Sequence, residues 1–258
     1  MTRIVFMGRK QVAADSLVWL NDQAGVQVVA VITDSHLENS PTSAVARSLG
    51  IPVMSRQQVE DSVSKQAIEF DLGLSMLYWQ KIRAPILDRA TLGVVNFHPA
   101  PLPDFKGTAG YNVAILNGLS EWASSAHYVD KDIDTGPIID VSHFPFDAGT
   151  ATAYTLEART RIALFDQFKS VVGRILKQRE RLPTTENVGG RYIARAEMEA
   201  MKEVRPGDDL DRKVRAFWFP PYDGAYVVVD GKKYTLVNRT ILETLADPSA
   251  TSLFSAAT

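Results

Sequence analysis

The chain has 258 residues, a formal net charge of −2 and no cysteine. This length allows one large α/β domain, or one domain with a small appendage. The weak negative charge argues against a nucleic-acid-binding protein that grips a phosphate backbone through many contacts. The lack of cysteine excludes disulfides, thiol nucleophiles and thiolate metal sites, and it fits a cytoplasmic location. No apolar run approaches the roughly 20 residues that span a bilayer, so we expect no membrane partner.

The first part of the chain alternates short β-rich runs with helical patterns. Helices are predicted after the first two of these runs, at 11–22 and 40–50, and a turn or two of helix at 84–90. This alternation predicts an α/β fold with a Rossmann-like, mostly parallel sheet and helices on both faces. The predicted strands are residues 3–7, 26–33, 51–54, 70–77 and 92–98.

The second part begins with a predicted helix at 109–118 and two strands, at 123–130 and 136–144. A long helix at 151–181 is expected to close a first domain, residues 1–190. The composition then changes, and residues 205–245 predict a small C-terminal module of helix, proline-rich aromatic corner and β-hairpin. Asp230-Gly231 is a strong two-residue turn signal for that hairpin. The polar tail, 246–258, is expected to be disordered.

The stretch "VVNFHPAPLP" at residues 94–103 places Asn96 and His98 where a strand ends. Side chains alternate along a strand, so the two point to the same side. In open α/β sheets, ligands bind at such strand ends. Three prolines follow and stiffen the exit loop, which suits a pair that must hold a reacting group in place. The alternative is that the pair only ties down a loop by hydrogen bonds.

A second stretch, "DKDIDTGPII" at residues 130–139, carries three alternating carboxylates. A calcium loop is excluded because its sixth position would be Thr135 and its twelfth Val141, instead of glycine and glutamate. A solvated acidic turn is one alternative. In the other alternative, the Asp134 side chain reaches His98, and Asn96, His98 and Asp134 together form a set of polar groups suited to acyl transfer. Such a set needs no serine or cysteine nucleophile if the acceptor is an amine.

With these motifs the sequence resembles the formyltransferases that use N10-formyltetrahydrofolate, which include methionyl-tRNA, glycinamide ribonucleotide and sugar N-formyltransferases. The resemblance covers roughly residues 1–180. The C-terminal "VRAFWFPPYDGAYVVVDGKKYTLV" also resembles the shortened C-terminal region of the sugar enzymes, and the chain as a whole is most similar to the GDP-perosamine N-formyltransferases. The matching residues are Asn96, His98, Leu102-Pro103, Lys106-Gly107 and Asp134-Thr135-Gly136.

The resemblance implies that an unprotonated amine attacks the formyl carbon of the folate. Asn96 and His98 would stabilise the oxyanion, and Asp134 would orient His98 and assist removal of the proton. No metal is implied. The folate, a co-substrate, would lie between the loops at 75–80 and 130–134. The cofactor-binding residues implied there are Met76, Leu77, Tyr78, Trp79, Asp130, Asp132 and Ile133.

The acceptor amine has to be chosen among the family's substrates. "MGRKQVA" after the first strand is neither the phosphate loop of the glycinamide ribonucleotide enzymes nor the glycine-rich fingerprint of a nicotinamide dehydrogenase. The tRNA enzymes carry a full C-terminal barrel and would want a basic surface. A nucleotide-linked amino sugar is left, and GDP-perosamine of O-antigen lipopolysaccharide synthesis is the closest match. A dTDP-linked amino sugar, methionyl-tRNA, plain hydrolysis of the formylfolate, and a catalytically silent nucleotide-sugar binder remain as alternatives.

Several residues are expected to contact that acceptor. Cations at the first strand end and after "LPDF" would meet the diphosphate. Trp218 and Phe219 are expected to form the core of the module or a dimer contact rather than to stack on a base. A homodimer through the C-terminal hairpin is expected, because a lone hairpin leaves an exposed edge. The predicted substrate-binding residues are Arg9, Lys10, Lys106, Gly107, Thr108, Tyr111, Asn112 and Tyr222.

Overall fold

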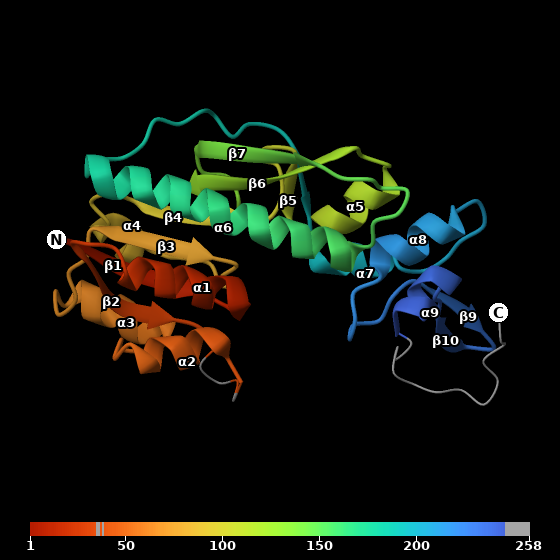
Figure 1. The fold of residues 1–258 in the computed structure, drawn as a ribbon, viewed down its shortest axis with the longest axis horizontal. Helices are drawn as coiled ribbons and strands as arrows, with labels where there is room; N and C mark the ends of the chain where they lie inside the picture. The colour runs from red at the N-terminus through yellow and green to blue at the C-terminus, as the bar shows by residue number, and fades with distance from the viewer. Residues whose placement is uncertain (35–36, 38, 246–258) are drawn as a thin grey trace, which may run out of the picture.

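A computed structural model describes residues 1–34, 37 and 39–245, and its centre is a six-stranded sheet in the order β2-β1-β3-β4-β6-β7. The first four strands in sequence run parallel, whereas β6 pairs antiparallel with β4 and with β7. The predicted mostly parallel α/β sheet is therefore confirmed (Figure 1). The strands are β1 (Thr2–Gly8), β2 (Val26–Ile32), β3 (Leu72–Met76), β4 (Val94–His98), β6 (Glu121–Tyr128) and β7 (Ile138–Pro145).

Helices cover both faces of the sheet because the buried strands are apolar on both sides. In β1, Ile4 and Phe6 pack with α1 (Lys10–Asn21), α2 (Pro41–Ser48) and α6 (Ala153–Gln178). Val5 and Met7 point the other way, towards α3 (Arg56–Ser64) and α4 (Ala84–Arg89). Figure 1 shows α6 lying along the sheet from one end to the other. The two faces of β1 are thereby covered by different helices.

The region 51–64 differs from the prediction. The expected strand at 51–54 is reduced to a single bridge between Val31 and Val53, because Pro52 has no N–H to donate to a ladder. The helix α3 follows it and was not predicted. Its start is a capping box: Ser55 accepts from Gln58 N while the Gln58 side chain accepts from Ser55 N.

Two small two-stranded sheets accompany the central sheet, and one of them is the expected C-terminal hairpin. β5 (Phe105–Gly107) pairs in parallel with β8 (Arg191–Ile193), and neither strand was predicted. The hairpin of β9 (Tyr226–Val229) and β10 (Lys232–Thr235) is confirmed around the Asp230-Gly231 turn. The remaining helices are α5 (Gly110–Leu116), α7 (Arg195–Ala200), α8 (Leu210–Phe217) and α9 (Arg239–Leu245).

The region after residue 205 shares a hydrophobic core with the rest of the molecule. Phe217 and Ile241 are buried in one cluster with Trp122 of β6 and Leu156 of α6. The division into 1–190 and 205–245 remains a prediction, and the tail 246–258 lies outside the described residues. Within the described residues no helix is both long and apolar enough to cross a membrane.

Candidate active site

Asn96 is the third of the five residues of β4 and is held by two neighbouring side chains. Its Oδ1 accepts a 2.7 Å hydrogen bond from Ser75 Oγ, and its Nδ2 is 3.0 Å from His127 Nε2. His127 Nδ1 lies 2.9 Å from the carbonyl oxygen of Tyr128. A carbonyl only accepts, so Nδ1 carries the proton and Nε2 accepts from the amide of Asn96. The amide nitrogen is thus identified, and its second N–H has no partner among the described residues.

His98 ends β4 and is only 6% exposed. Its Nε2 is 2.9 Å from the Phe105 carbonyl oxygen, so Nε2 carries the proton in the neutral ring. Nδ1 is left unprotonated, 3.5 Å from Asp134 Oδ1. Burial lowers the pKa of His98, although the charge of Asp134 opposes that effect. The ring is therefore a neutral base at physiological pH, and it also ties down the 99–105 loop as the alternative interpretation supposed.

Asp134 sits in the turn after β6 with a left-handed backbone, φ +56°. Its Oδ2 accepts a 3.0 Å hydrogen bond from Gly107 N, and its Oδ1 is 3.7 Å from His127 Nε2. Burial alone would raise the pKa of Asp134, but His98, His127 and the Gly107 N–H together lower it to about 2. The carboxylate is therefore ionised beside a neutral imidazole. Gly136 closes this turn, since a Cβ there would lie 1.8 Å from the Tyr128 carbonyl oxygen.

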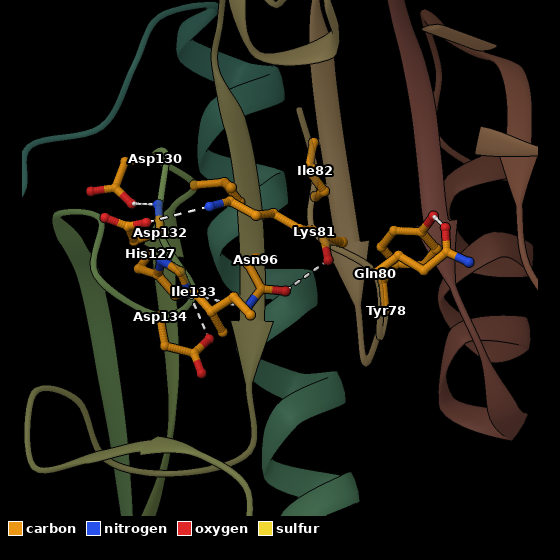
Figure 2. Close-up of a pocket in the computed structure, with 12 residues that line it drawn as sticks. Tyr78, Gln80, Lys81, Ile82, Asn96, His127, Asp130, Asp132, Ile133 and Asp134 are labelled. Atoms are coloured by element: carbon orange, nitrogen blue, oxygen red, sulfur yellow. Dashed lines mark hydrogen bonds and ion pairs between the residues drawn. The ribbon is translucent and has the colours of Figure 1, made fainter. Parts of the chain in front are cut away.

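The fold thus brings Asn96, His98 and Asp134 together as predicted, and it adds two residues that were not. Ser75 and His127 come from the strands on either side of β4, and Asn96 is in register with both. Figure 2 shows Asn96, His127 and Asp134 converging at the end of the strand. Their pairing depends on the order β3-β4-β6. An isolated serine and histidine in two strand-forming runs carry no signal of it.

A narrow pocket of about 60 Å³ opens beside this centre between the 78–82 and 129–134 loops. Lys81 Nζ forms a 3.3 Å ion pair with Asp132 across it (Figure 2). Tyr78 and Ile133 also line the pocket, and burial raises the pKa of Tyr78 to about 12. Asp130 lines it too and accepts a 2.6 Å hydrogen bond from Thr135 Oγ1.

The other predicted folate residues are divided between core and cleft. Met76 is fully buried in the core beneath the sheet end, so its side chain is not at the surface of the pocket. Leu77 and Trp79 line a second, larger cleft instead. The guanidinium of Arg9 lies 5.2 Å from the centroid of the Trp79 ring.

This larger cleft has a volume of about 430 Å³ and is also lined by Asn96, His98 and Asp134. Arg9 Nε is 3.2 Å from Asp34 Oδ2, which holds the cation at the cleft wall. Glu157 of α6 lines the cleft as well, and it was not predicted. Burial raises the pKa of Glu157, with Arg161 and Lys10 opposing the effect. The predicted acceptor residues found along the cleft are Arg9, Lys10, Gly107, Thr108 and Tyr111.

Three predicted acceptor residues lie elsewhere. The Asn112 amide donates a 2.6 Å hydrogen bond to the Ala216 carbonyl and so joins α5 to α8. Lys106 Nζ donates to the Gly189 carbonyl at 2.8 Å. Tyr222 is exposed and its ring packs 6.1 Å from that of Phe219. Phe219 was expected in the core of the module or at a dimer contact; it packs on the hydrophobic core and also lines the cleft.

Among the residues that the structure describes, no three histidine, cysteine or acidic side chains lie together so that they could hold a metal ion. The polar groups that meet at this centre belong to Asn96, His98 and Asp134. They are one free amide N–H, one neutral imidazole nitrogen and one ionised carboxylate. Together they can bind a developing oxyanion and move a proton.

Comparison with known proteins identifies the class. Residues 2–171 match the family model described as formyl transferase. The chain therefore belongs to the formyl transferase family, and the prediction of an N-formyltransferase enzyme is confirmed.

Similar proteins include enzymes with different acceptors. The methionyl-tRNA formyltransferase of Latilactobacillus sakei is 28% identical, over 97% of this chain and 81% of its own length. A 4-N formyltransferase from Francisella tularensis has a TM-score of 0.78 at 19% identity, covering 92% of this chain and 97% of that one. An N-formyltransferase from Helicobacter canadensis, in complex with folinic acid and dTDP-3-aminofucose, has a TM-score of 0.71 at 21% identity, covering 90% and 86%.

Proposed function

We propose that this enzyme transfers a formyl group from N10-formyltetrahydrofolate to the amino group of a nucleotide-linked amino sugar. The observation that carries the proposal is the larger cleft. It joins Asn96, His98 and Asp134 to the cations Arg9 and Lys10 in one continuous space. A nucleotide sugar has an amine at one end and a diphosphate further along, and this arrangement of polar groups matches both.

The catalytic steps follow from the hydrogen bonds of the centre. The unprotonated amine attacks the formyl carbon, and the free N–H of Asn96 donates to the oxyanion that forms. The attacking nitrogen becomes acidic and passes its proton to Nδ1 of His98, directly or through water. Asp134 lies 3.5 Å from that nitrogen and stabilises the imidazolium. The adduct then collapses, its carbon–N10 bond breaks, and N10 of the folate takes the proton back from His98.

The narrow pocket is the proposed folate site. Tyr78 and Ile133 can contact the pterin, and the half-exposed ion pair of Lys81 and Asp132 also lines the pocket. Pterin nitrogens need hydrogen-bond partners, which the polar 129–134 loop can supply. The Helicobacter canadensis neighbour was solved with folinic acid and a dTDP-linked amino sugar, which supports a folate and a nucleotide sugar as the substrate pair.

We assign recognition of the acceptor to the outer part of the larger cleft, which Arg9 and Glu157 line. Arg9, fixed by Asp34, would bind a phosphate, since guanidinium pairs well with phosphate oxygens. Glu157 is 15% exposed at its side chain and has Arg161 as its ion-pair partner at 3.3 Å. Its carboxylate can accept hydrogen bonds from sugar hydroxyls. We keep GDP-perosamine as the proposed sugar, with a dTDP-linked amino sugar as the nearest alternative.

A second acceptor is methionyl-tRNA, which the 28% identity to the Latilactobacillus sakei enzyme favours. The net charge of −2 argues against it, because a tRNA surface requires many cationic contacts. We also retain the proposal of a homodimer. The half-exposed Val228, Val229 and Tyr234 of the hairpin support it, and sedimentation equilibrium tests it.

One experiment separates these acceptors. The protein is mixed with N10-formyltetrahydrofolate and, in parallel, with GDP-, dTDP- and UDP-linked 3- and 4-amino sugars or charged methionyl-tRNA. Mass spectrometry then looks for the gain of one formyl group. Rapid formylation of one sugar supports the proposal and names the acceptor. Formylation of the tRNA alone, or loss of formate from the folate without any acceptor product, contradicts it.

A further inference from the structure

Asn187, in the segment between α6 and β8, contacts the turn that carries Asp134. Its Nδ2 donates to the Asp134 carbonyl at 3.0 Å and to the Gly136 carbonyl at 2.8 Å. Both N–H groups of one amide are thus used on the two sides of Thr135. Its Oδ1 is buried and has no hydrogen-bond partner in the described part of the chain. The side chain therefore acts on this turn entirely as a donor.

The Asp134 turn needs such support. A residue other than glycine with φ near +56° is held in a sparsely populated backbone conformation. It persists when neighbouring groups fix it from outside. The direction of the Asp134 carboxylate depends on this backbone, because the side chain has only two rotatable bonds. A turn that relaxes would move Oδ1 away from Nδ1 of His98.

The same segment also braces the other side of the catalytic centre. β8 pairs with β5, in which the Phe105 carbonyl accepts from His98 and the Gly107 N–H donates to Asp134. Between Asn187 and β8, Gly190 has φ +72°, and a Cβ there would lie 1.7 Å from the Pro103 carbonyl oxygen. The backbone at Gly190 thus lies directly against the proline-rich exit loop. Residues 187–193 therefore contact the Asp134 turn, the proline-rich exit loop and β5.

We propose that Asn187 is a positioning residue for the formyl transfer reaction: its two donated hydrogen bonds hold the Asp134 turn so that the carboxylate faces His98. The inference rests on the proposed function for its effect on turnover. Its effect on the histidines is independent of the acceptor. Residues 182–190 carry no strand or helix signal, so a role for this asparagine in catalysis has no trace in the local sequence pattern.

The competing explanation is that Asn187 only fills space between the segment and the turn. The isosteric Asn187→Asp variant separates the two. It keeps the shape of the side chain but removes both N–H donors and sets carboxylate oxygens against two carbonyl oxygens. A packing role predicts that Asp is tolerated and Ala is not. A donor role predicts that Asp is at least as damaging as Ala.

The first measurement is an NMR spectrum of the imidazole nitrogens, which is simple because the chain has only four histidines. We expect Asn187→Asp and Asn187→Ala to shift the His98 and His127 signals. The control, Asn238→Ala, also removes an asparagine with two side-chain hydrogen bonds, to Asp211 and from Ile241. It should leave both signals in place. Unchanged His98 and His127 signals in Asn187→Asp would overturn the inference, whatever the acceptor is.

The second measurement is steady-state kinetics with the acceptor that the wild-type protein formylates. We expect both Asn187 variants to lower kcat by about 10- to 100-fold while the KM of the acceptor changes little. Asn238→Ala should retain the wild-type kcat. An active wild type with a fully active Asn187→Asp variant contradicts the positioning role. A wild type that formylates no amino sugar contradicts the proposed function instead, and the NMR result then decides on Asn187.

Discussion

The two ends of the larger cleft are built differently. At the inner end, His98 and Asp134 are less than 10% exposed, and each makes a hydrogen bond to a backbone group. At the outer end, Arg9 and Glu157 are partly exposed; each forms one ion pair, and the guanidinium of Arg9 also lies over the Trp79 ring. Under the proposed function, a dense hydrogen-bond network would hold the reacting atoms, whereas the acceptor would meet side chains that a few substitutions can change.

Asp134→Asn should have the largest effect at the inner end. The amide keeps the shape but cannot stabilise the His98 imidazolium, so kcat should fall by about 10³-fold. Single-turnover formylation measures it. Asp147→Asn is the control, since Asp147 also accepts from a backbone N–H but lies in an exposed turn, where its other partner is Thr150. A kcat within threefold of wild type would remove Asp134 from the mechanism.

Asn96→Ala should come next, with a fall in kcat of about 10²-fold, because it removes one donor to the oxyanion. His127 also loses the N–H that it accepts from Asn96. The KM of the folate should change less than kcat, since the donor acts mainly in the transition state. Steady-state rates at saturating acceptor test this expectation. A variant that loses affinity for the folate and keeps kcat would show that Asn96 only binds substrate.

Lowering the pH should remove the contribution of Asp134 to the free energy of unfolding. The pKa of Asp134 is about 2 in the folded protein and 3.8 in its ordinary state, so the carboxylate stabilises the fold by about 2 kcal/mol above pH 3.8. This contribution is lost as the pH falls from 3.8 towards 2, because the unfolded chain takes up the proton first. Urea unfolding of wild type and Asp134→Asn at pH 6 and pH 2.5 measures it. An equal loss of stability in both proteins would contradict the expected coupling.

At the outer end, Glu157→Gln should raise the KM of the acceptor about tenfold, equivalent to one lost charge-assisted hydrogen bond, and leave kcat unchanged. Asp166→Asn is the matched control, because Asp166 is a carboxylate of the same helix with a lysine partner at 2.7 Å. Arg161→Gln removes the partner of Glu157 and tests whether the pair acts together. An unchanged KM in Glu157→Gln would exclude the carboxylate from acceptor recognition.

The sequence by itself determined the parallel sheet, the hairpin and three of the residues at the centre. Strands that are apolar on both faces and helices with a 3.6-residue period carry their own local signal, and Asn96, His98 and Asp134 lie in two recognisable motifs. Asp230-Gly231 determined the hairpin turn in the same way. These features depend on residues close together in the chain.

Only the tertiary structure decided which distant residues complete the site. Ser75 and His127 meet Asn96 because β3 and β6 flank β4. The sequence of a single strand does not indicate which strands will be its neighbours in the sheet. Glu157 faces the cleft because of how α6 crosses the sheet, and Asn187 reaches the Asp134 turn across a sequence separation of 53 residues. Conversely, the side chain of Asn112 was predicted to contact the acceptor, but in the folded chain it donates to the Ala216 carbonyl of α8. Hydrogen bonds between remote segments form only when the whole chain has folded, so no local pattern predicts them.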